Sequence, residues 1–359
     1  MNITTLNMTT LDGGVIIKKG GGGGNSGGGG AKPNWTGHAD AEGLKAIGWT
    51  DEDIAYYQAN GVNWNEEDDE WYKVSEDNKA LYGVLTASNI QTYKDRIVYL
   101  PKIDTSRVTS MYNMFSGCYS LTAIPMLDTS NVTSMGSMFD NCRSLTTIPM
   151  LDTSNVTNMG SMFNRCASLT TIPLLDTSKV TSMDSMFMYC YFLTSIPMLD
   201  TSNVTSMGNM FNYCFSLTTI PMLDTSNVTS MYSMFYSCSA LKFIPMLDTS
   251  KVTNMGRMFT YCPSLTTIPM LDTSNVTSMG NMFDDCYSLT HANLKNVKLA
   301  YLLNDSALLS KDSLLYLINN EAAESAITIK LASYAYDKWA TDPDIVAALA
   351  NHPNISISK

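Results

Sequence analysis

Apolar side chains recur in this chain with a spacing close to three residues, inside a longer period of 24 residues. One period, residues 128–151, reads DTSNVTSMGSMFDNCRSLTTIPML, and equivalent sequences run from Asp104 to about Lys295. Counted from the aspartate, the apolar positions are 5, 8, 11, 12, 15, 18, 21 and 24. This spacing is neither the 2 of a long strand nor the 3.6 of a long helix. The pattern therefore predicts a coil that turns inward at regular corners.

Each repeat contains two stretches that we expect to be strands. They are Leu-Thr-x-Ile before the proline and Val-Thr-x-Met after the Asp-Thr-Ser turn, because both are rich in β-branched residues. The Met-Phe-x-x-Cys stretch between them predicts a short helical turn. A period between about 20 and 50 residues is typical of a solenoid, in which each repeat packs on its neighbours. If adjacent coils pair as parallel strands about 4.8 Å apart, eight repeats form a body on the order of 40 Å long.

The frame C-x-x-L-T-x-I-P followed by D-T-S-x-V-T-x-M-x-x-M-F resembles the BspA-like leucine-rich repeat. That family includes surface proteins of gut and oral bacteria, of mycoplasmas and of some of their phages. The resemblance covers about residues 97–295 and is carried by eight near-identical copies. It implies an α/β leucine-rich repeat solenoid that is noncatalytic and commonly associated with surface attachment.

The segments before the repeats differ from them in composition. Residues 1–33 form a short head and a Gly-rich tract that we expect to be a flexible tether. Residues 34–96 contain four of the five tryptophans, and capping signals near Thr50 and Ser75 predict helices. We therefore expect a helical, Trp-rich N-terminal cap ahead of a solenoid at residues 97–295.

Residues 296–359 predict a mixed α/β segment. We expect a helix from near Ser310, a strand at 327–331, a helix after Pro343 and a last strand at 355–357. The terminal repeat of a solenoid exposes its core unless something covers it. We therefore expect this segment to be the C-terminal cap.

Charge and hydropathy exclude several classes of protein. The formal net charge of −11 and the pI of about 4.7 argue against nucleic-acid binding, which needs clustered Lys and Arg. No stretch approaches the roughly 18–20 apolar residues of a membrane span, so we expect no membrane insertion. The sequence shows no recognisable Sec signal peptide. The resemblance nevertheless implies a location on a cell surface or on a virion.

The eight cysteines recur every 24 residues and have three possible roles: disulfides, a metal site or buried thiols. Stacked coils place equivalent Cβ atoms farther apart than the usual ~3.8 Å of a disulfide, and a straight row does not match the tetrahedral geometry of zinc. We therefore predict a row of reduced, buried thiols, with no metal and no cofactor.

Aspartates recur at the first position of every repeat, from Asp104 to Asp272. Stacked carboxylates raise the hypothesis of calcium binding. The alternative is that each aspartate accepts hydrogen bonds from the Thr-Ser turn that follows it. We favour the turn.

Catalytic residues in a recognisable arrangement are missing from the sequence. His38, His291 and His352 lie in different segments, without the repeated neighbours that a nucleophilic triad needs. We therefore do not expect an enzyme.

Aromatic residues collect at the variable positions around the cysteine corner, beside Ser, Asn, Gly and Arg. Tyrosine in such surroundings is typical of adaptable recognition surfaces. The other interpretation, which stays open, is that these rings only pack over the outer edge of the coil. The candidate ligand-binding residues are Tyr119, Tyr189, Tyr191, Phe192, Tyr213, Phe215, Tyr236, Tyr261 and Tyr287.

These observations predict a noncatalytic, surface-displayed binding or adhesion protein. Its expected partner is a protein or glycan on a host or neighbouring cell surface, contacted through one face of the solenoid. The alternative is a structural or tail-appendage component of a phage or prophage particle, with no ligand of its own.

Overall fold

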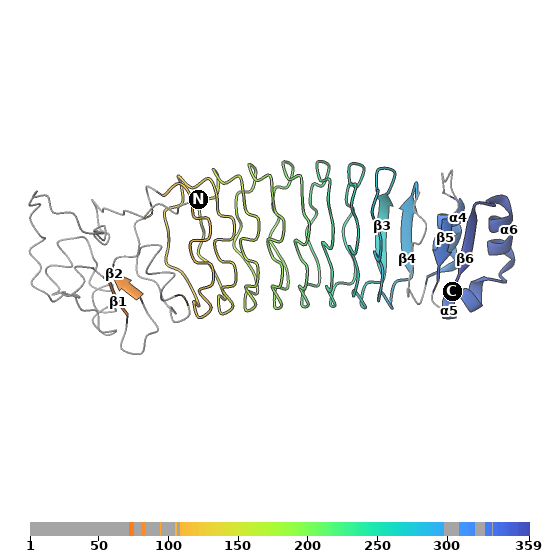
Figure 1. The fold of residues 1–359 in the computed structure, drawn as a ribbon, viewed down its shortest axis with the longest axis horizontal. Coiled ribbons are helices and arrows are strands. Elements are labelled where there is room, and N and C mark those ends of the chain that lie inside the picture. Colours follow the sequence, from red (N-terminus) through yellow and green to blue (C-terminus); the bar gives the residue numbers. More distant parts are fainter. Residues whose placement is uncertain are drawn as a thin grey trace, which may run out of the picture.

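The computed structural model describes residues 72–74, 81–83, 94, 105, 108–297, 309–319, 327–331 and 333–359. Residues 108–297 form successive coils that lie side by side along the long axis of the molecule (Figure 1). Parallel bridges join neighbouring coils in the Val-Thr-x-Met stretch, for example Ser134 to Asn158 and Asn158 to Ser182. This arrangement is a solenoid, as the period predicts.

Within residues 108–297, continuous strands form only at the last coils. Strand β3 (Thr267–Asp272) pairs in parallel with β4 (His291–Lys295), and the register shifts between Ile268 and Leu271. Elsewhere the Leu-Thr-x-Ile stretches are joined by single hydrogen bonds, such as Thr146 N–H to the Thr122 carbonyl at 3.2 Å. The proline at position 22 of the first seven repeats has no N–H to donate, which limits the length of the ladder.

The core consists of one residue type at each inward position. All the apolar positions predicted from the pattern are buried throughout residues 108–289. The phenylalanines stack with ring centroids 5.6–5.7 Å apart and interplanar angles of 3–12°. We call this the phenylalanine stack; its members are Phe115, Phe139, Phe163, Phe187, Phe211, Phe235, Phe259 and Phe283.

The helical turn expected at Met-Phe-x-x-Cys is replaced by consecutive tight turns, and residues 108–297 contain no α-helix. Met138 N–H and Cys142 N–H bond to carbonyls three residues earlier, but Ser137 and Asn141 have φ of 54° and 64°. A left-handed residue ends a helix. The N–H groups of Ser137 and Asn141 instead bond to carbonyls of the next coil, at 2.9 and 2.7 Å.

The turn interpretation of the aspartates is confirmed. Asp128 Oδ1 accepts hydrogen bonds from Ser130 N–H at 3.1 Å and Ser130 Oγ at 2.7 Å. Equivalent bonds from the serine two residues later lower the pKa of Asp152 and Asp176 below the usual range of a carboxyl group. The hydrogen bonds of the turn therefore stabilise the carboxylates in their charged form.

The C-terminal segment contains α4 (Lys311–Asn319), β5 (Ile327–Lys330), α5 (Ser333–Trp339), α6 (Pro343–Asn351) and β6 (Ile355–Ser358). The four expected elements are confirmed, whereas α5 was not predicted. Strands β5 and β6 pair in parallel. Ser310 N–H bonds to the Thr290 carbonyl and Ser313 Oγ accepts from Ala292 N–H, so the segment contacts the last coil.

In the segment predicted to be a helical N-terminal cap, the described residues form a hairpin instead. Strands β1 (Tyr72–Val74) and β2 (Leu81–Gly83) pair antiparallel, and neither was predicted. The helices expected after Thr50 and Ser75, the Gly-rich tract and the head of residues 1–33 lie outside the described residues.

The cysteines are free and buried, as predicted. Each thiol from Cys142 to Cys286 donates to the carbonyl of the phenylalanine in the preceding coil, at 3.0–3.2 Å. Burial raises the pKa of Cys142 and Cys166 well above the ordinary value, and that of Cys286 to about 12. The native state therefore holds the neutral thiol.

This burial predicts a loss of stability in alkali. A thiol with a raised pKa in the native state stabilises fully below its unfolded pKa of about 8.5, and this contribution is lost as the pH rises above that value. The free energy of unfolding should therefore fall from pH 8.5 to 10, by up to about 1.4 kcal/mol per pH unit for each buried thiol. Urea unfolding at a series of pH values measures this slope.

The matched control is the double variant Cys190→Ala/Cys214→Ala. Its slope should be smaller than that of the native chain by the contribution of two thiols. Equal slopes in the two proteins would show that the cysteines ionise as freely in the native state as in the unfolded one.

Candidate functional site

Six of the predicted aromatic residues come together on consecutive coils. Tyr189 stacks on Tyr213 with centroids 4.8 Å apart, and Tyr191 stacks on Phe215 at 5.2 Å. The two stacks meet edge to face, because Tyr213 and Phe215 are 5.7 Å apart at 85°. We call this group the aromatic array: Tyr189, Tyr191, Tyr213, Phe215, Tyr236 and Tyr261.

The array continues along the solenoid at both ends of the Tyr189–Tyr213 stack. Tyr236 tilts against Tyr213 at 5.2 Å and meets Tyr261 edge to face at 5.5 Å. At the other end the Arg165 guanidinium lies 5.2 Å from the Tyr189 ring centroid, within the range of a cation–π contact. Burial, followed by the neighbouring Tyr213, raises the pKa of Tyr236 to about 12. Tyr236 therefore keeps its proton at neutral pH.

Three tyrosines of the array adopt a backbone conformation that side chains of their size avoid. Tyr189, Tyr213 and Tyr261 have φ of 61°, 61° and 59°. Left-handed backbone costs a bulky residue about 1–2 kcal/mol, whereas Asn, Asp and Gly tolerate it better. Every coil is left-handed at this position: the other coils hold Gly117, Asn141, Arg165, Ser237 and Asp285, of which Gly, Asn and Asp are the residues that this backbone favours. The tyrosines therefore oppose the local backbone preference.

The other predicted site residues do not join the array through a described ring contact. Tyr119 lies under the Arg143 guanidinium at 5.1 Å, and Tyr287 donates its hydroxyl to Asp285. Phe192 is 60 % exposed. Tyr112 and Tyr232, at another variable position, lie over the backbone of Gly in the following coil. The structure thus brings six of the nine predicted residues together through the ring contacts given above.

Groups suited to metal binding or catalysis do not gather within the described part of the chain. No cluster of three or more His, Cys, Asp or Glu is placed to hold a metal ion in those residues. His291 contacts Thr290 Oγ1 at 2.8 Å on β4, and His352 lies at the end of α6. His38 is outside the described residues. None of the described helices has the length and apolar character needed to cross a bilayer.

Comparison with protein families gives one match, to the family described as "Mycoplasma protein of unknown function, DUF285". It covers residues 86–174, 169–243 and 242–311. The chain belongs to the DUF285 family. Because the match spans well over half of the chain and all the described coils, it confirms the resemblance to BspA-like leucine-rich repeats. A search of curated proteins finds no match for this DUF285 protein.

Solved leucine-rich repeat structures resemble the DUF285 chain only distantly. The T. pallidum leucine-rich repeat protein shares 22 % identity, with 61 % of this chain and 86 % of that chain covered and a TM-score of 0.32. A leucine-rich repeat protein of Eubacterium ventriosum shares 19 % identity, with 64 % of this chain and 86 % of that chain covered and a TM-score of 0.30. The functional domain of InlJ from Listeria monocytogenes, which includes a cysteine ladder, shares 15 % identity, with 67 % of this chain and 66 % of that chain covered and a TM-score of 0.19. The fold assignment therefore rests on the repeat geometry and the family match.

The strained tyrosines provide a test of whether the array stabilises the fold. In Tyr261→Asn the gain from relieving left-handed strain offsets the loss of one ring contact of about 0.5–1.5 kcal/mol. We therefore expect the free energy of unfolding in urea to change by less than about 0.5 kcal/mol.

Asn141→Ala is the matched control, because it places a Cβ-bearing residue without a polar side chain on the same left-handed backbone. It should lose about 1 kcal/mol. A loss of 2 kcal/mol or more in Tyr261→Asn would identify the ring as a packing element of the solenoid.

Proposed function

We propose that this DUF285 protein is a noncatalytic binding protein that recognises a protein partner through the aromatic array. The observation that carries the proposal is the placement of Tyr189, Tyr213 and Tyr261 on left-handed backbone. Left-handed backbone recurs in every coil, but a bulky tyrosine gains no stability from it, and backbone strain clusters at functional sites. The array therefore serves recognition at a cost in stability.

The geometry of the array suits a recognition surface in two further respects. Its rings are fixed by one another before a partner arrives, which lowers the entropy lost on binding. Tyr191, Phe215 and Tyr261 are 37–48 % exposed, so each presents apolar area to solvent. Rigid tyrosines that combine an apolar ring with a hydroxyl are frequent among the residues that dominate protein interfaces.

The way the rings stack favours a protein over a glycan. A sugar that stacks on an aromatic residue needs an open ring face. Tyr213 has Tyr189 of the preceding coil stacked on it and Tyr236 of the following coil tilted against it, and Tyr189 has a further cation–π contact with Arg165. These rings offer mainly edges and hydroxyls, which suit backbone groups and side chains of a protein. A location on a cell surface or virion is the setting that the family resemblance implies for such a protein.

A binding screen with a matched pair of variants tests the proposal. The full chain is applied to a panel of purified extracellular proteins and to a printed glycan array. We expect a protein ligand whose binding falls at least 100-fold in Tyr189→Ala/Tyr191→Ala/Tyr213→Ala/Phe215→Ala, because truncation removes the contacting rings. The control Tyr112→Ala/Tyr232→Ala removes exposed tyrosines outside the array and should bind normally.

Three outcomes would contradict the proposal. Ligand binding that is unaffected in the quadruple variant would place the site elsewhere. A glycan ligand in place of a protein would refute the argument from ring faces. A chain that binds nothing on either panel would support the structural component of a phage particle instead.

A further inference from the structure

A second apolar surface runs along the solenoid, at repeat position 23. Its side chains are 58–66 % exposed except for the last, Met270, which is 40 % exposed. Methionines at positions 8 and 11 are by contrast buried in the core. We call this surface the methionine row: Met126, Met150, Leu174, Met198, Met222, Met246 and Met270.

A row of carboxylates runs beside the methionine row. In each coil the residue after the methionine is a buried leucine and the next is an aspartate, as in Met198, Leu199 and Asp200. Since alternate residues of extended backbone point to the same side, each exposed methionine has an aspartate beside it. We call these carboxylates the aspartate row: Asp128, Asp152, Asp176, Asp200, Asp224, Asp248 and Asp272.

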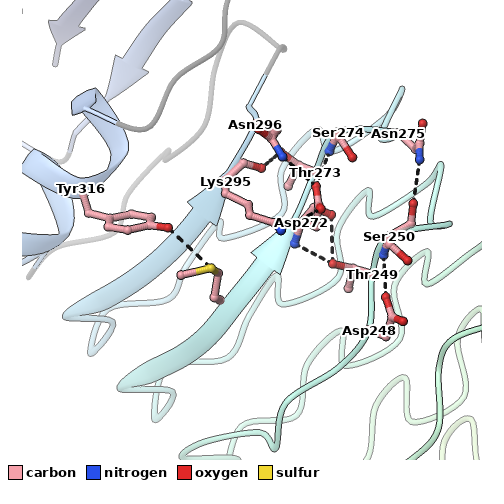
Figure 2. Close-up of polar contacts among 11 residues, drawn as sticks. Asp248, Thr249, Ser250, Asp272, Thr273, Ser274, Asn275, Lys295, Asn296 and Tyr316 are labelled. Carbon is pink, nitrogen blue, oxygen red and sulfur yellow. Dashed lines mark hydrogen bonds and ion pairs between the residues drawn. The ribbon is translucent and has the colours of Figure 1, made fainter.

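At the last coil the chain itself covers one methionine and one aspartate. Tyr316 of α4 directs its hydroxyl to Met270 Sδ at 3.5 Å, and Lys295 Nζ lies 3.0 Å from Asp272 Oδ2 (Figure 2). Asp272 also accepts from Asn296 Nδ2 at 3.1 Å. Both residues are less exposed than their equivalents in earlier coils. A tyrosine and a lysine side by side, the one on the methionine sulfur through its hydroxyl and the other on the carboxylate, are therefore a combination that fits this surface.

We propose that the uncovered part of the two rows, from Met126 to Asp248, binds a basic segment of a partner protein that carries aromatic side chains. The partner's rings would lie on the methionine sulfurs, where contacts of sulfur with aromatic rings are favourable. Its Lys or Arg side chains would pair with the aspartates. The chain carries a net charge of −11, which favours the approach of a cationic segment.

A second copy of the chain does not fit the same surface. The rows of a second copy contain methionine, leucine and aspartate but no Lys or Arg, so they would leave the carboxylates at the contact without a cation. Both the apolar and the anionic component thus point to a partner of different composition. This surface is separate from the aromatic array in residues and in the ligand chemistry that it selects.

A fluorescent peptide measures the selectivity of the surface. The probe is an eight-residue peptide of alternating Tyr and Lys, and its binding to the full chain is followed by fluorescence polarisation. Peptides with Glu in place of Lys, or Ala in place of Tyr, should bind at least tenfold more weakly. Binding of the probe should also weaken as salt is raised, because exposed charges are screened.

Two sets of variants locate the site. Met198→Ser/Met222→Ser/Met246→Ser removes part of the apolar row, and Asp200→Asn/Asp224→Asn/Asp248→Asn removes charge while retaining the Oδ1 acceptor of each turn. Each set should weaken the probe at least tenfold. Asp285→Asn/Asp312→Asn/Asp337→Asn removes equal charge elsewhere and should leave binding intact, as should the quadruple variant of the aromatic array.

The proposal is wrong if the row variants bind the probe as the native chain does, or if the charge control weakens it equally, since that would mean nonspecific attraction to an acidic protein. Equal binding of the Glu peptide would remove the ionic component. A dimer in sedimentation that dissociates in the methionine variant would assign the row to a second copy.

Discussion

The structure depends on the stacking of coils of equal length in register. A single coil has almost no regular hydrogen bonding of its own beyond tight turns, and its backbone groups bond to the coils on both sides. Phe139 N–H, for example, bonds to the Met162 carbonyl of the following coil, and Thr133 N–H to the Thr109 carbonyl of the preceding one. Because every coil has 24 residues, identical side chains meet, and the phenylalanine stack forms at a constant spacing. Insertion of one residue would break both the hydrogen bonds and the stack.

The sequence predicts the core of such a protein well, because the repeat shows directly which positions face inward. It predicts the backbone path at the corner less well. Met-Phe-x-x-Cys has the composition of a helical turn, yet the carbonyls of the next coil capture the N–H groups of Ser137 and Asn141 and favour left-handed residues there. Helix α5 has no acidic residue in its first turn, so a common sequence signal for the start of a helix is missing there, and the sequence did not predict this helix. The hairpin of β1 and β2 likewise depends on pairing between strands that periodicity does not show.

The sequence also locates the aromatic residues, but it does not show which of them touch. Tyr119 and Tyr191 are equivalent in the repeat, yet Tyr191 contacts Tyr189 on its own coil and Phe215 on the following one, whereas Tyr119 contacts the Arg143 guanidinium. The sequence does not predict the left-handed backbone at position 14 either, because that conformation depends on a hydrogen bond to a carbonyl of the next coil. The regular core makes both surfaces possible, because outward positions do not contact the phenylalanine stack. The residues at these positions can therefore be the same in every coil or differ from coil to coil. One face carries the varied aromatic array, and another carries the constant methionine and aspartate rows.

The role of register is tested most directly by internal deletions of two lengths. Removing residues 153–176 joins Asp152 to Thr177 and leaves the repeat frame intact, whereas removing residues 153–164 shifts every later position by half a coil. We expect the 24-residue deletion to fold, with a cooperative urea transition and a slightly lower free energy of unfolding. We expect the 12-residue deletion to lose the cooperative transition. Equal folding of the two proteins would contradict the account, because it would show that the coils do not need matching positions to stack.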